Sequence, residues 1–246
     1  MSGDGRGLKF GTVAESYDLY RPGPPKEAAT LLGDLMGREV LEVGAGTGKL
    51  TRLLVELGAR VSIVEPDEDM RRVLLRRSPG VRVLGGRAED LSAEEGSFDV
   101  AVSSSAWHWF AQPEATNEMA RVLRDDGALF VLWNGFSRDD PWIVELTKLR
   151  HSRDDANTRP RGWHATFDPD GPFVDVDDVS IDWTWTRSID DVVALFGTYS
   201  GAIIQSDENR ETMERIVRAR LVEHVGEGMV ELPMTLRGTT ARRRPR

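Results

Sequence analysis

An acidic residue and three closely spaced glycines are the residues of this sequence best suited to binding a ligand. Glu42 precedes Gly44, Gly46 and Gly48 in the run VLEVGAGTGKLT, which follows an apolar segment and opens a helical pattern of leucines. Glycine has no side chain to hold a ligand away and tolerates positive φ. Such a strand, turn and helix can bring backbone amides and a helix N-terminus against a ligand. The pattern therefore predicts a ligand-binding turn.

The spacing and charge of this turn favour one nucleoside ligand over another. A dinucleotide fingerprint, G-x-G-x-x-G, needs a third glycine where the helix packs on the strand, but that position is Lys49. A carboxylate at Glu42 would repel a pyrophosphate. S-adenosylmethionine (SAM) has no phosphate and carries an ammonium and a sulfonium cation. The sign of Glu42 therefore favours SAM over NAD.

A second acidic residue follows the next apolar run, ARVSIVE. Glu65 stands 21 residues after Gly44, close to the offset of about 20 at which an acidic residue meets ribose hydroxyls in βαβ units. Pro66 keeps Glu65 away from helical angles, which fits the end of a strand. We expect Glu65 to accept hydrogen bonds from the ribose. The alternative is a solvated carboxylate at a strand end.

The segment SSSAWHWF, 103 to 110, follows the apolar run FDVAVS. Ligands of open α/β sheets bind beyond the strand ends, at the switch point between the first and fourth strands. Ser104 and Ser105 should therefore lie near the reacting group, and His108 could act as a general base. Trp107 and Trp109 could form a wall that tolerates a cation. The alternative is that both tryptophans pack and His108 bonds the backbone.

The glycine turn resembles the first motif of the class I SAM-dependent methyltransferases, in which an acidic residue is followed by G-x-G-x-G. The resemblance covers about 10 to 134 and is closest to the type 11, trans-aconitate-methyltransferase-like group. It implies methyl transfer from SAM, with S-adenosylhomocysteine (SAH) as product, to a small-molecule acceptor through O-, N- or C-methylation. Motif and resemblance together assign to the cofactor Tyr17, Arg21, Glu42, Gly44, Ala45, Gly46, Thr47, Gly48, Glu65, Pro66, Met70, Ala88, Glu89, Ser104 and Ser105.

The resemblance also leaves several roles open. It implies that Glu89 accepts from the adenine amine, although a helix-capping Asp90 would explain the same segment. Tyr20 could touch the acceptor or belong to an N-terminal helix that packs as a lid. The residues assigned to the acceptor are Tyr20, Trp107, Trp109 and Asn134, with weaker candidates Trp142, Trp163, His164, Phe167 and Tyr199.

Composition narrows the class of protein. The chain has 246 residues, no cysteine and a formal net charge of −9. Absence of cysteine excludes a thiolate metal site and a cysteine nucleophile, and suits a reducing cytoplasm. No apolar run is long enough to span a bilayer, and the first ten residues lack the apolar region of a signal peptide. We expect a cytoplasmic enzyme without a metal and without a broad nucleic-acid surface.

The apolar patterns predict a single α/β domain over 1–246. The resemblance implies that its fold is a three-layer Rossmann-like sandwich with a seven-stranded, mostly parallel sheet that ends in an antiparallel pair. An N-terminal lid (1–25), a cofactor-binding half (26–135) and an acceptor-side half (136–246) divide the chain. The expected parallel strands are 40–43, 59–65, 81–84, 98–103 and 128–133. In the last part of the chain we expect helices at 141–151, 190–199 and 208–225 and strands at 174–185 and 229–236.

Three rival functions remain at this point. The first is an NAD-dependent Rossmann oxidoreductase, which Lys49 and Glu42 disfavour. The second is a non-catalytic module that keeps the cofactor pocket. The third is an RNA methyltransferase that uses the basic tail Arg242–Arg246, although such tails are more commonly disordered and solvated.

Overall fold

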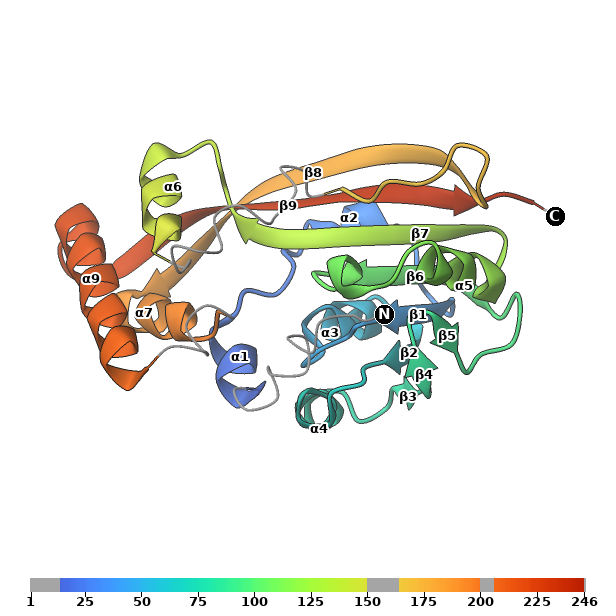
Figure 1. The fold of residues 1–246 in the computed structure, drawn as a ribbon, viewed down its shortest axis with the longest axis horizontal. Helices are drawn as coiled ribbons and strands as arrows, with labels where there is room; N and C mark the ends of the chain where they lie inside the picture. Colours follow the sequence, from blue (N-terminus) through green and yellow to red (C-terminus); the bar gives the residue numbers. More distant parts are fainter. Residues whose placement is uncertain (1–13, 150–163, 200–205, 246) are drawn as a thin grey trace.

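The computed structural model describes residues 14–149, 164–199 and 206–245. Within these ranges, seven strands form one sheet in the order β3-β2-β1-β6-β7-β9-β8 (Figure 1). The parallel strands are β1 (Glu39–Val43), β2 (Arg60–Val64), β3 (Arg82–Val83), β6 (Phe98–Ser104) and β7 (Leu123–Phe136). The strands β9 (Met229–Arg243) and β8 (Phe173–Ser188) add to β7 in antiparallel fashion. The predicted fold class is confirmed.

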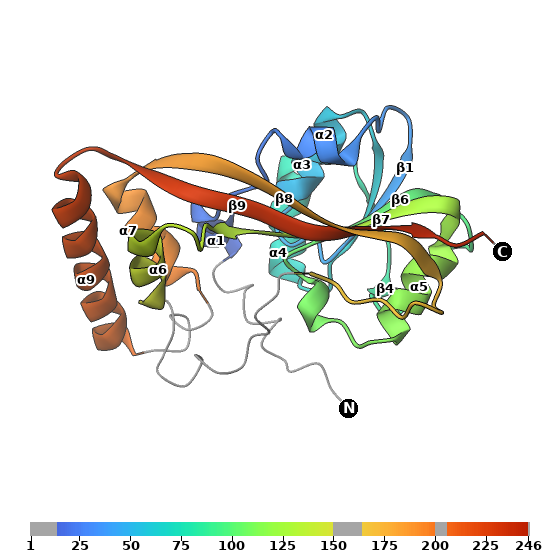
Figure 2. The same ribbon diagram turned by 90° about the horizontal axis from the view of Figure 1, so that it is seen from above.

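Helices cover both faces of the parallel strands (Figure 2). The helices α2 (Ala28–Leu32) and α3 (Lys49–Glu56) pack on one face, and α5 (Glu114–Val122) packs on the other. Near the β3 edge of the sheet, α4 (Glu68–Arg77) packs on the same face as α3, because its buried Leu74 belongs to the same core cluster. Two short strands, β4 (Gly86–Arg87) and β5 (Asp90–Leu91), form a separate antiparallel pair. Asp90 therefore lies in a strand, and the helix-capping alternative for it is wrong.

The centre of the sheet is β6, which is apolar because both of its faces are covered. All four residues from Val100 to Ser103 are buried, as a central parallel strand requires. Its neighbour β1 pairs with it from Val40↔Val100 to Glu42↔Val102. Because β2 continues the sheet on one side of β1 and β6 on the other, the predicted switch point lies between β1 and β6.

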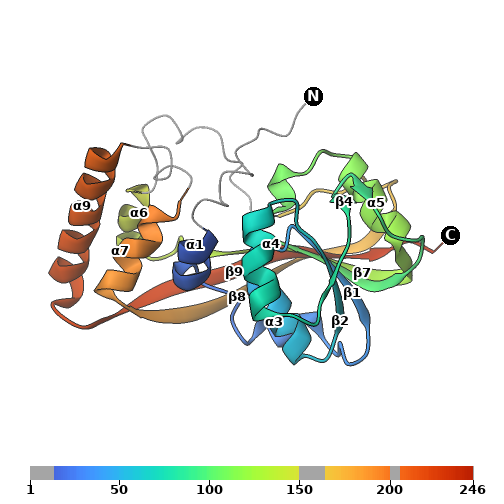
Figure 3. The same ribbon diagram turned by 90° about the horizontal axis from the view of Figure 1, so that it is seen from below.

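The three strands β7, β8 and β9 extend well beyond the parallel part of the sheet (Figures 1 and 3). Their extensions carry α6 (Pro141–Lys148), α7 (Ile189–Gly197) and α9 (Asp207–Val225), which we call the helical cap. A second core fills the space between the cap and the strands and includes the fully buried Phe196 and Leu221. The first described helix, α1 (Ala14–Tyr20), contacts both α7 and α4 and so bridges the two halves.

Side-chain caps fix where several of these helices begin. The carboxylate of Asp67 accepts hydrogen bonds from the amides of Asp69 and Met70, both at 3.0 Å, at the start of α4. Asp140 accepts from the amides of Trp142 and Ile143 at the start of α6. Each such cap stabilises its helix by about 1 kcal/mol. These helices therefore start where the sequence places an acidic residue before an apolar run.

Several sequence expectations differ from the structure in detail. Met36 and Ile216 are large apolar residues that are nevertheless 73% and 43% exposed, because α2 ends before Met36 and α9 turns Ile216 away from the cap core. The strand expected at 81–84 is only the two residues of β3, whereas β7 and β9 are much longer than expected. Trp163, one of the weaker candidates for the acceptor site, lies outside the described residues.

The described part of the basic tail is only partly exposed to solvent. Arg242 and Arg243 belong to β9. Arg243 is 7% exposed, donates to the carbonyl of Ala120 at 2.6 Å and pairs with Asp125. Arg244 donates to two carbonyls of the turn before β8. The expectation of a disordered, solvated tail is therefore wrong for Arg243, which is buried against α5 and the start of β7, whereas Arg242 and Arg244 are exposed.

Two further properties concern the class of protein. Among the residues that the structure describes, no helix is both long and apolar enough to cross a membrane. In the same residues, no cluster of three or more histidine, cysteine, aspartate or glutamate side chains is arranged to hold a metal ion.

Candidate active site

A cavity of about 400 Å³ lies at the carboxyl ends of β1, β2 and β6 and extends toward the helical cap. This volume is within the range of small-molecule sites, about 300–1,000 Å³. Most of the predicted site residues line it. They are Tyr17, Arg21, Glu42, Gly44, Ala45, Gly46, Thr47, Glu65, Pro66, Met70, Ala88, Glu89, Ser104, Ser105, His108, Trp109 and Asn134.

The three glycines of the turn have different steric roles. A Cβ on Gly44 would lie 2.4 Å from the Cβ of Ala106, and a Cβ on Gly48 would lie 2.7 Å from the Cγ of Leu74. These two glycines are therefore needed for packing. Gly46 has a φ of +57° and would meet nothing within 4 Å. A ligand can approach the backbone of Gly46 because no side chain occupies that space.

The amides of the turn face the end of β2 rather than the cavity. Those of Gly44 and Ala45 donate to the carbonyl of Val64, at 2.8 and 3.3 Å. The amide of Gly46 donates to Glu65 Oε2 at 2.7 Å. The expectation that these amides face a ligand is therefore wrong. A turn whose amides are already bonded, one of them to a carboxylate, is poorly suited to a pyrophosphate, which needs free donors.

Glu42 is almost fully buried, at the end of β1. The hydroxyl of Thr51, on α3, donates to Glu42 Oε2 at 2.6 Å. Burial raises the pKa of Glu42 to about 8, the hydrogen bond from Thr51 opposes the rise, and the charge of Glu65 adds to it. From the sequence alone, Glu42 is expected to carry a fixed negative charge. The structure corrects this, because without a cationic ligand the carboxyl group is mostly protonated at neutral pH.

The other two acidic residues of the cavity are anchored by backbone amides. Glu65 accepts from the amide of Asp67 at 2.8 Å as well as from Gly46. Burial raises the pKa of Glu65, although these two hydrogen bonds oppose the rise. Glu89 accepts from the amide of Ala111 at 2.7 Å. Each carboxylate is thus oriented by the backbone before any ligand arrives.

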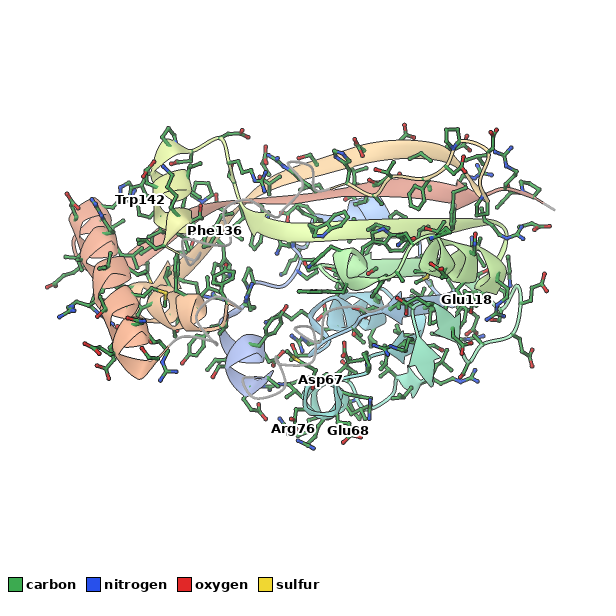
Figure 4. The ribbon with its side chains drawn as sticks, in the orientation of Figure 1. Asp67, Glu68, Arg76, Glu118, Phe136 and Trp142 are labelled. Carbon is green, nitrogen blue, oxygen red and sulfur yellow. The ribbon has the colours of Figure 1, made fainter. Side chains whose placement is uncertain are left out.

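The helix α1 is fixed over the cavity by charged contacts. Lys49 Nζ donates to the carbonyl of Asp18 at 2.6 Å, and the Asp18 carboxylate pairs with Arg52 at 3.0 Å and Arg77 at 3.3 Å. Burial lowers the pKa of Lys49 to about 8, although the charge of Asp18 opposes this. Arg76 of α4, labelled in Figure 4 with Asp67, also pairs with Glu15 of α1. The residue that replaces the third glycine of a dinucleotide motif therefore holds α1 in place.

Comparison with known proteins matches this geometry. A family model described as a methyltransferase domain matches residues 41–131. A putative type II methyltransferase from Anaeromyxobacter dehalogenans superposes with a TM-score of 0.62 at 24% identity, covering 92% of this chain and all of that one. Phosphoethanolamine N-methyltransferase 2 of Haemonchus contortus, in complex with phosphomonomethylethanolamine and SAH, gives 0.52 at 13% identity, covering 96% of this chain and 58% of that one. At these sequence identities, the structural similarity establishes a shared fold and nothing about substrate.

A curated relative establishes the family. An uncharacterized methyltransferase of Mycobacterium tuberculosis is 35% identical over 218 residues, which cover 88% of this chain and 87% of the relative. The chain belongs to the class I methyltransferase family. The predicted family is thereby confirmed.

His108 of this methyltransferase is exposed at the cavity, within the 3₁₀ turn η2 (Trp107–Trp109). Trp133 Nε1 donates to His108 Nδ1 in a long hydrogen bond of 3.4 Å. In a neutral imidazole, a ring whose Nδ1 accepts carries its proton on Nε2. In this arrangement Nε2 is a donor, so His108 could act as a base only if Trp133 released Nδ1.

Six described residues among the predicted site residues of the methyltransferase do not line the cavity: Trp107, Tyr20, Gly48 and the weaker candidates Trp142, His164 and Phe167. Trp107 is 6% exposed and packs in the core against Phe110, and Tyr20 packs against the cap core. Gly48 caps α3 beneath the turn. Packing therefore accounts for the positions of these three residues, and the cavity gives no support to assigning Trp107 and Tyr20 to the acceptor or Gly48 to the cofactor.

The methyltransferase also has cavity residues that the sequence did not reveal. Arg237 of β9 lies opposite Trp133 of β7, and Phe136 ends β7 where the sheet meets the cap (Figure 4). Arg87, Arg138 and Thr147 line the cavity as well. The alternation of the last strand carries a weak signal for Arg237. The register between β7 and β9, which brings it to the cavity, cannot be read from the sequence.

Asn134 and Arg21 hold the wall between the two halves of the methyltransferase. Asn134 Nδ2 donates to the carbonyl of Gly23 at 2.6 Å, and its Oδ1 accepts from Trp183 Nε1 at 3.1 Å. Arg21 donates to the hydroxyl and the carbonyl of Thr198, at 2.8 and 3.0 Å. Both residues therefore connect the segment after α1 to the strands and helices of the acceptor side.

Proposed function

We propose that the methyltransferase transfers a methyl group from SAM to a small organic acceptor. The observation that carries the proposal is the open backbone of Gly46, which lines the cavity together with Glu42 and Glu65. A nucleoside with a cationic amino acid fits this cradle better than a dinucleotide, because the Gly46 amide already bonds a carboxylate. The SAH in the H. contortus enzyme supports the same donor for this fold.

The residues of the cradle have distinct expected roles. When bound, SAM supplies a methyl group on a positively charged sulfur. Glu42, which the arrival of an ammonium group would ionise, holds the amino-acid end. Glu65 accepts from the ribose hydroxyls, and Glu89 lies where it can accept from the adenine amine. Met70 and Ala88 supply apolar contacts for the base, since both are buried and line the cavity.

The acceptor side supports direct transfer. Methyl transfer requires the attacking atom, the methyl carbon and the sulfur to lie in line, so positioning contributes more than any single catalytic group. Ser105, with a φ of +59°, turns the chain sharply at the end of β6. This turn leads into η2, which exposes His108 and Trp109 to the cavity. His108 then serves to orient the acceptor through a donated hydrogen bond.

Calorimetry with SAH and NAD on the full chain tests the proposal. We expect SAH to bind and NAD not to bind. Glu65→Gln should weaken SAH by about tenfold or more, because hydrogen bonds to a charged group contribute about 1.5–3 kcal/mol. Glu68→Gln is the matched control, since Glu68 is 80% exposed in the adjacent turn of α4 and its side chain does not line the cavity (Figure 4).

Two results would contradict the proposal. Binding of NAD without binding of SAH would favour the oxidoreductase. Binding of SAH without methyl transfer to any member of a broad acceptor panel would favour a non-catalytic module.

A further inference from the structure

A second cavity, of about 660 Å³, lies at the opposite end of the parallel strands from the candidate active site. It is lined by Glu39, Arg60 and Arg82, the first residues of β1, β2 and β3, and by residues of α3. The loop 78–81, which follows α4, also lines it. Among the described residues, none lines both cavities. Sheets of this kind bind their ligands at the carboxyl ends of the strands, so the second cavity is separate from the site of methyl transfer.

Arginine predominates among the charged residues of the second cavity. Its described lining residues include only two carboxylates, those of Glu39 and Glu56, and four arginines, which are Arg52, Arg60, Arg77 and Arg82. The whole chain, by contrast, carries a formal net charge of −9. A concave surface with an excess of one sign of charge attracts ions of the opposite sign. The second cavity is therefore a local exception that favours an anion.

Two of these arginines are available to a ligand. The Arg82 side chain makes no hydrogen bond or ion pair within the part of the chain that the structure describes. Arg60 pairs with Glu39 at 3.1 Å, but the two side chains are 72% and 35% exposed. An ion pair this exposed to water is weak. An anion in the cavity can therefore compete with Glu39 for Arg60.

The same cavity also has apolar lining residues. Val55 of α3, Val61 of β2, Ala59 and Val81 contribute to it. Val55 is 46% exposed although its side chain is apolar. A ligand with an apolar body would remove such surface from water, which is favourable. The lining therefore fits an anionic group on an apolar body better than a free inorganic anion.

Two arginines of the second cavity also hold α1. The Asp18 carboxylate of α1 pairs with Arg52 at 3.0 Å and with Arg77 at 3.3 Å. The Asp18 side chain is only 6% exposed, whereas that of Arg77 is 58% exposed and can reach a ligand. A buried carboxylate that loses a partner is destabilised. Because Tyr17, the neighbour of Asp18, lines the active-site cavity, the two cavities are connected through α1.

We propose that the second cavity binds a small organic phosphate through Arg60, Arg77 and Arg82, and that this ligand weakens the binding of SAM and SAH. The phosphate group draws Arg77 away from Asp18, so α1 is held less firmly over the active-site cavity. By thermodynamic linkage, SAH weakens the binding of the phosphate by the same factor. Binding to the second cavity is independent of the proposed function, and only the coupling to SAH rests on it.

Calorimetry with phenyl phosphate on the unliganded full chain, at constant ionic strength, tests the site. We expect phenol and inorganic phosphate to bind at least about tenfold more weakly, because each lacks one of the two kinds of contact. Arg82→Gln should weaken phenyl phosphate by about tenfold, since it removes a charge-assisted hydrogen bond. Glu56→Gln should strengthen it, because a carboxylate repels phosphate. Arg72→Gln is the matched control, since Arg72 is an exposed, ion-paired arginine of α4 that does not line the cavity.

Titration of SAH with and without saturating phenyl phosphate tests the coupling. We expect phenyl phosphate to weaken SAH by about fivefold or more in the wild type. In Arg77→Gln and in Arg82→Gln this effect should be largely lost. Without phenyl phosphate, Arg82→Gln should bind SAH within about twofold of the wild type, because Arg82 does not line the active-site cavity.

Several outcomes overturn this proposal. They are absence of saturable phenyl phosphate binding at millimolar concentration, unchanged affinity for it in Arg82→Gln, and unchanged affinity for SAH in its presence. An effect on SAH of equal size in the wild type and in Arg82→Gln would show direct competition in the active-site cavity and would also overturn it. Failure of SAH to bind without phosphate would instead reject the proposed function, and the phenyl phosphate calorimetry would still decide whether the second cavity is a site.

Discussion

The carboxyl groups of Glu42 and Glu65 lie near each other at the ends of the neighbouring parallel strands β1 and β2. Burial raises the pKa of Glu42 to about 8, and the charge of Glu65 contributes to the rise. Glu42 accepts a hydrogen bond from the hydroxyl of Thr51, and Glu65 accepts hydrogen bonds from two backbone amides. The cradle therefore contains one proton that a cationic ligand would displace.

Binding of SAH should release this proton. At pH 7 the unliganded Glu42 is mostly protonated, and the ammonium group of SAH favours its ionised form. We expect calorimetry in buffers of different ionisation enthalpy to show that the wild type releases several tenths of a proton or more at pH 7. Glu42→Gln should release less and bind SAH more weakly. Equal proton release by both proteins would contradict a contact between Glu42 and the ammonium group.

The same carboxyl group should make the stability of the unliganded protein depend on pH. Its pKa is about 8 in the folded chain against 4.5 for an ordinary glutamate. Between these values the folded state holds a proton that the unfolded state has lost, so the free energy of unfolding falls as pH rises. At pH 8.5, Glu42→Gln should therefore unfold at higher denaturant than the wild type, by at least about 1 kcal/mol. At pH 4.5 the gain should vanish, and a gain of equal size at both pH values would be inconsistent with titration of Glu42.

Alanine substitutions should separate the two kinds of glycine in the turn. Gly46→Ala meets open space, so its stability cost should be limited to about 1–2 kcal/mol for the positive φ. Its new methyl group enters the cavity, so SAH binding should fall by more than about tenfold. Gly44→Ala adds a clash with Ala106 to its strain and should cost about 1–3 kcal/mol more in stability.

Urea unfolding and SAH titration of both variants provide the measurement. Gly80→Ala is a suitable reference, because Gly80 has no atoms within 4 Å of its added Cβ and no positive φ. Wild-type affinity for SAH in Gly46→Ala would mean that the ligand does not approach this backbone.

His108→Gln should retain most of the turnover. A glutamine amide can donate a hydrogen bond as Nε2 does, whereas removal of a general base typically lowers the rate by 10² to 10⁴-fold. With an accepted acceptor, we expect kcat to fall by less than about tenfold. A larger fall, together with loss of the corresponding limb of the pH–rate profile, would restore the prediction that His108 acts as a base.

Arg243 should contribute more to stability than the neighbouring arginines. Its guanidinium is buried and bonds the Ala120 carbonyl and Asp125, so Arg243→Gln should lower the free energy of unfolding by about 1–3 kcal/mol. Arg242 forms only exposed pairs, and Arg242→Gln should change stability by less than about 1 kcal/mol. Denaturant unfolding at neutral pH compares the two, and equal effects would show that the tail is not held through Arg243.

The local sequence was sufficient to predict the fold of the cofactor half. Parallel strands buried on both faces must be apolar throughout, and glycine is needed where Gly44 and Gly48 have positive φ and close neighbours. Such requirements concern residues close together in the chain, so the β1 turn and the switch point followed from patterns, whereas the antiparallel pair followed from the resemblance. The same local evidence placed Glu65 at the cavity, and the resemblance placed Glu89 there.

Only the tertiary structure decided what these residues face. The protonation of Glu42 depends on burial beside α3 and on the neighbouring charge of Glu65. Trp107 belongs to the core because its ring packs against Phe110 and Phe167. Arg237 reaches the cavity through the register of β9 against β7, and the basic tail is held by residues more than one hundred positions earlier. The sequence determined the elements and the turn, because their causes are local. Burial, register and the pairing of distant charges depend on how those elements pack, and they decided the electrostatics of the site.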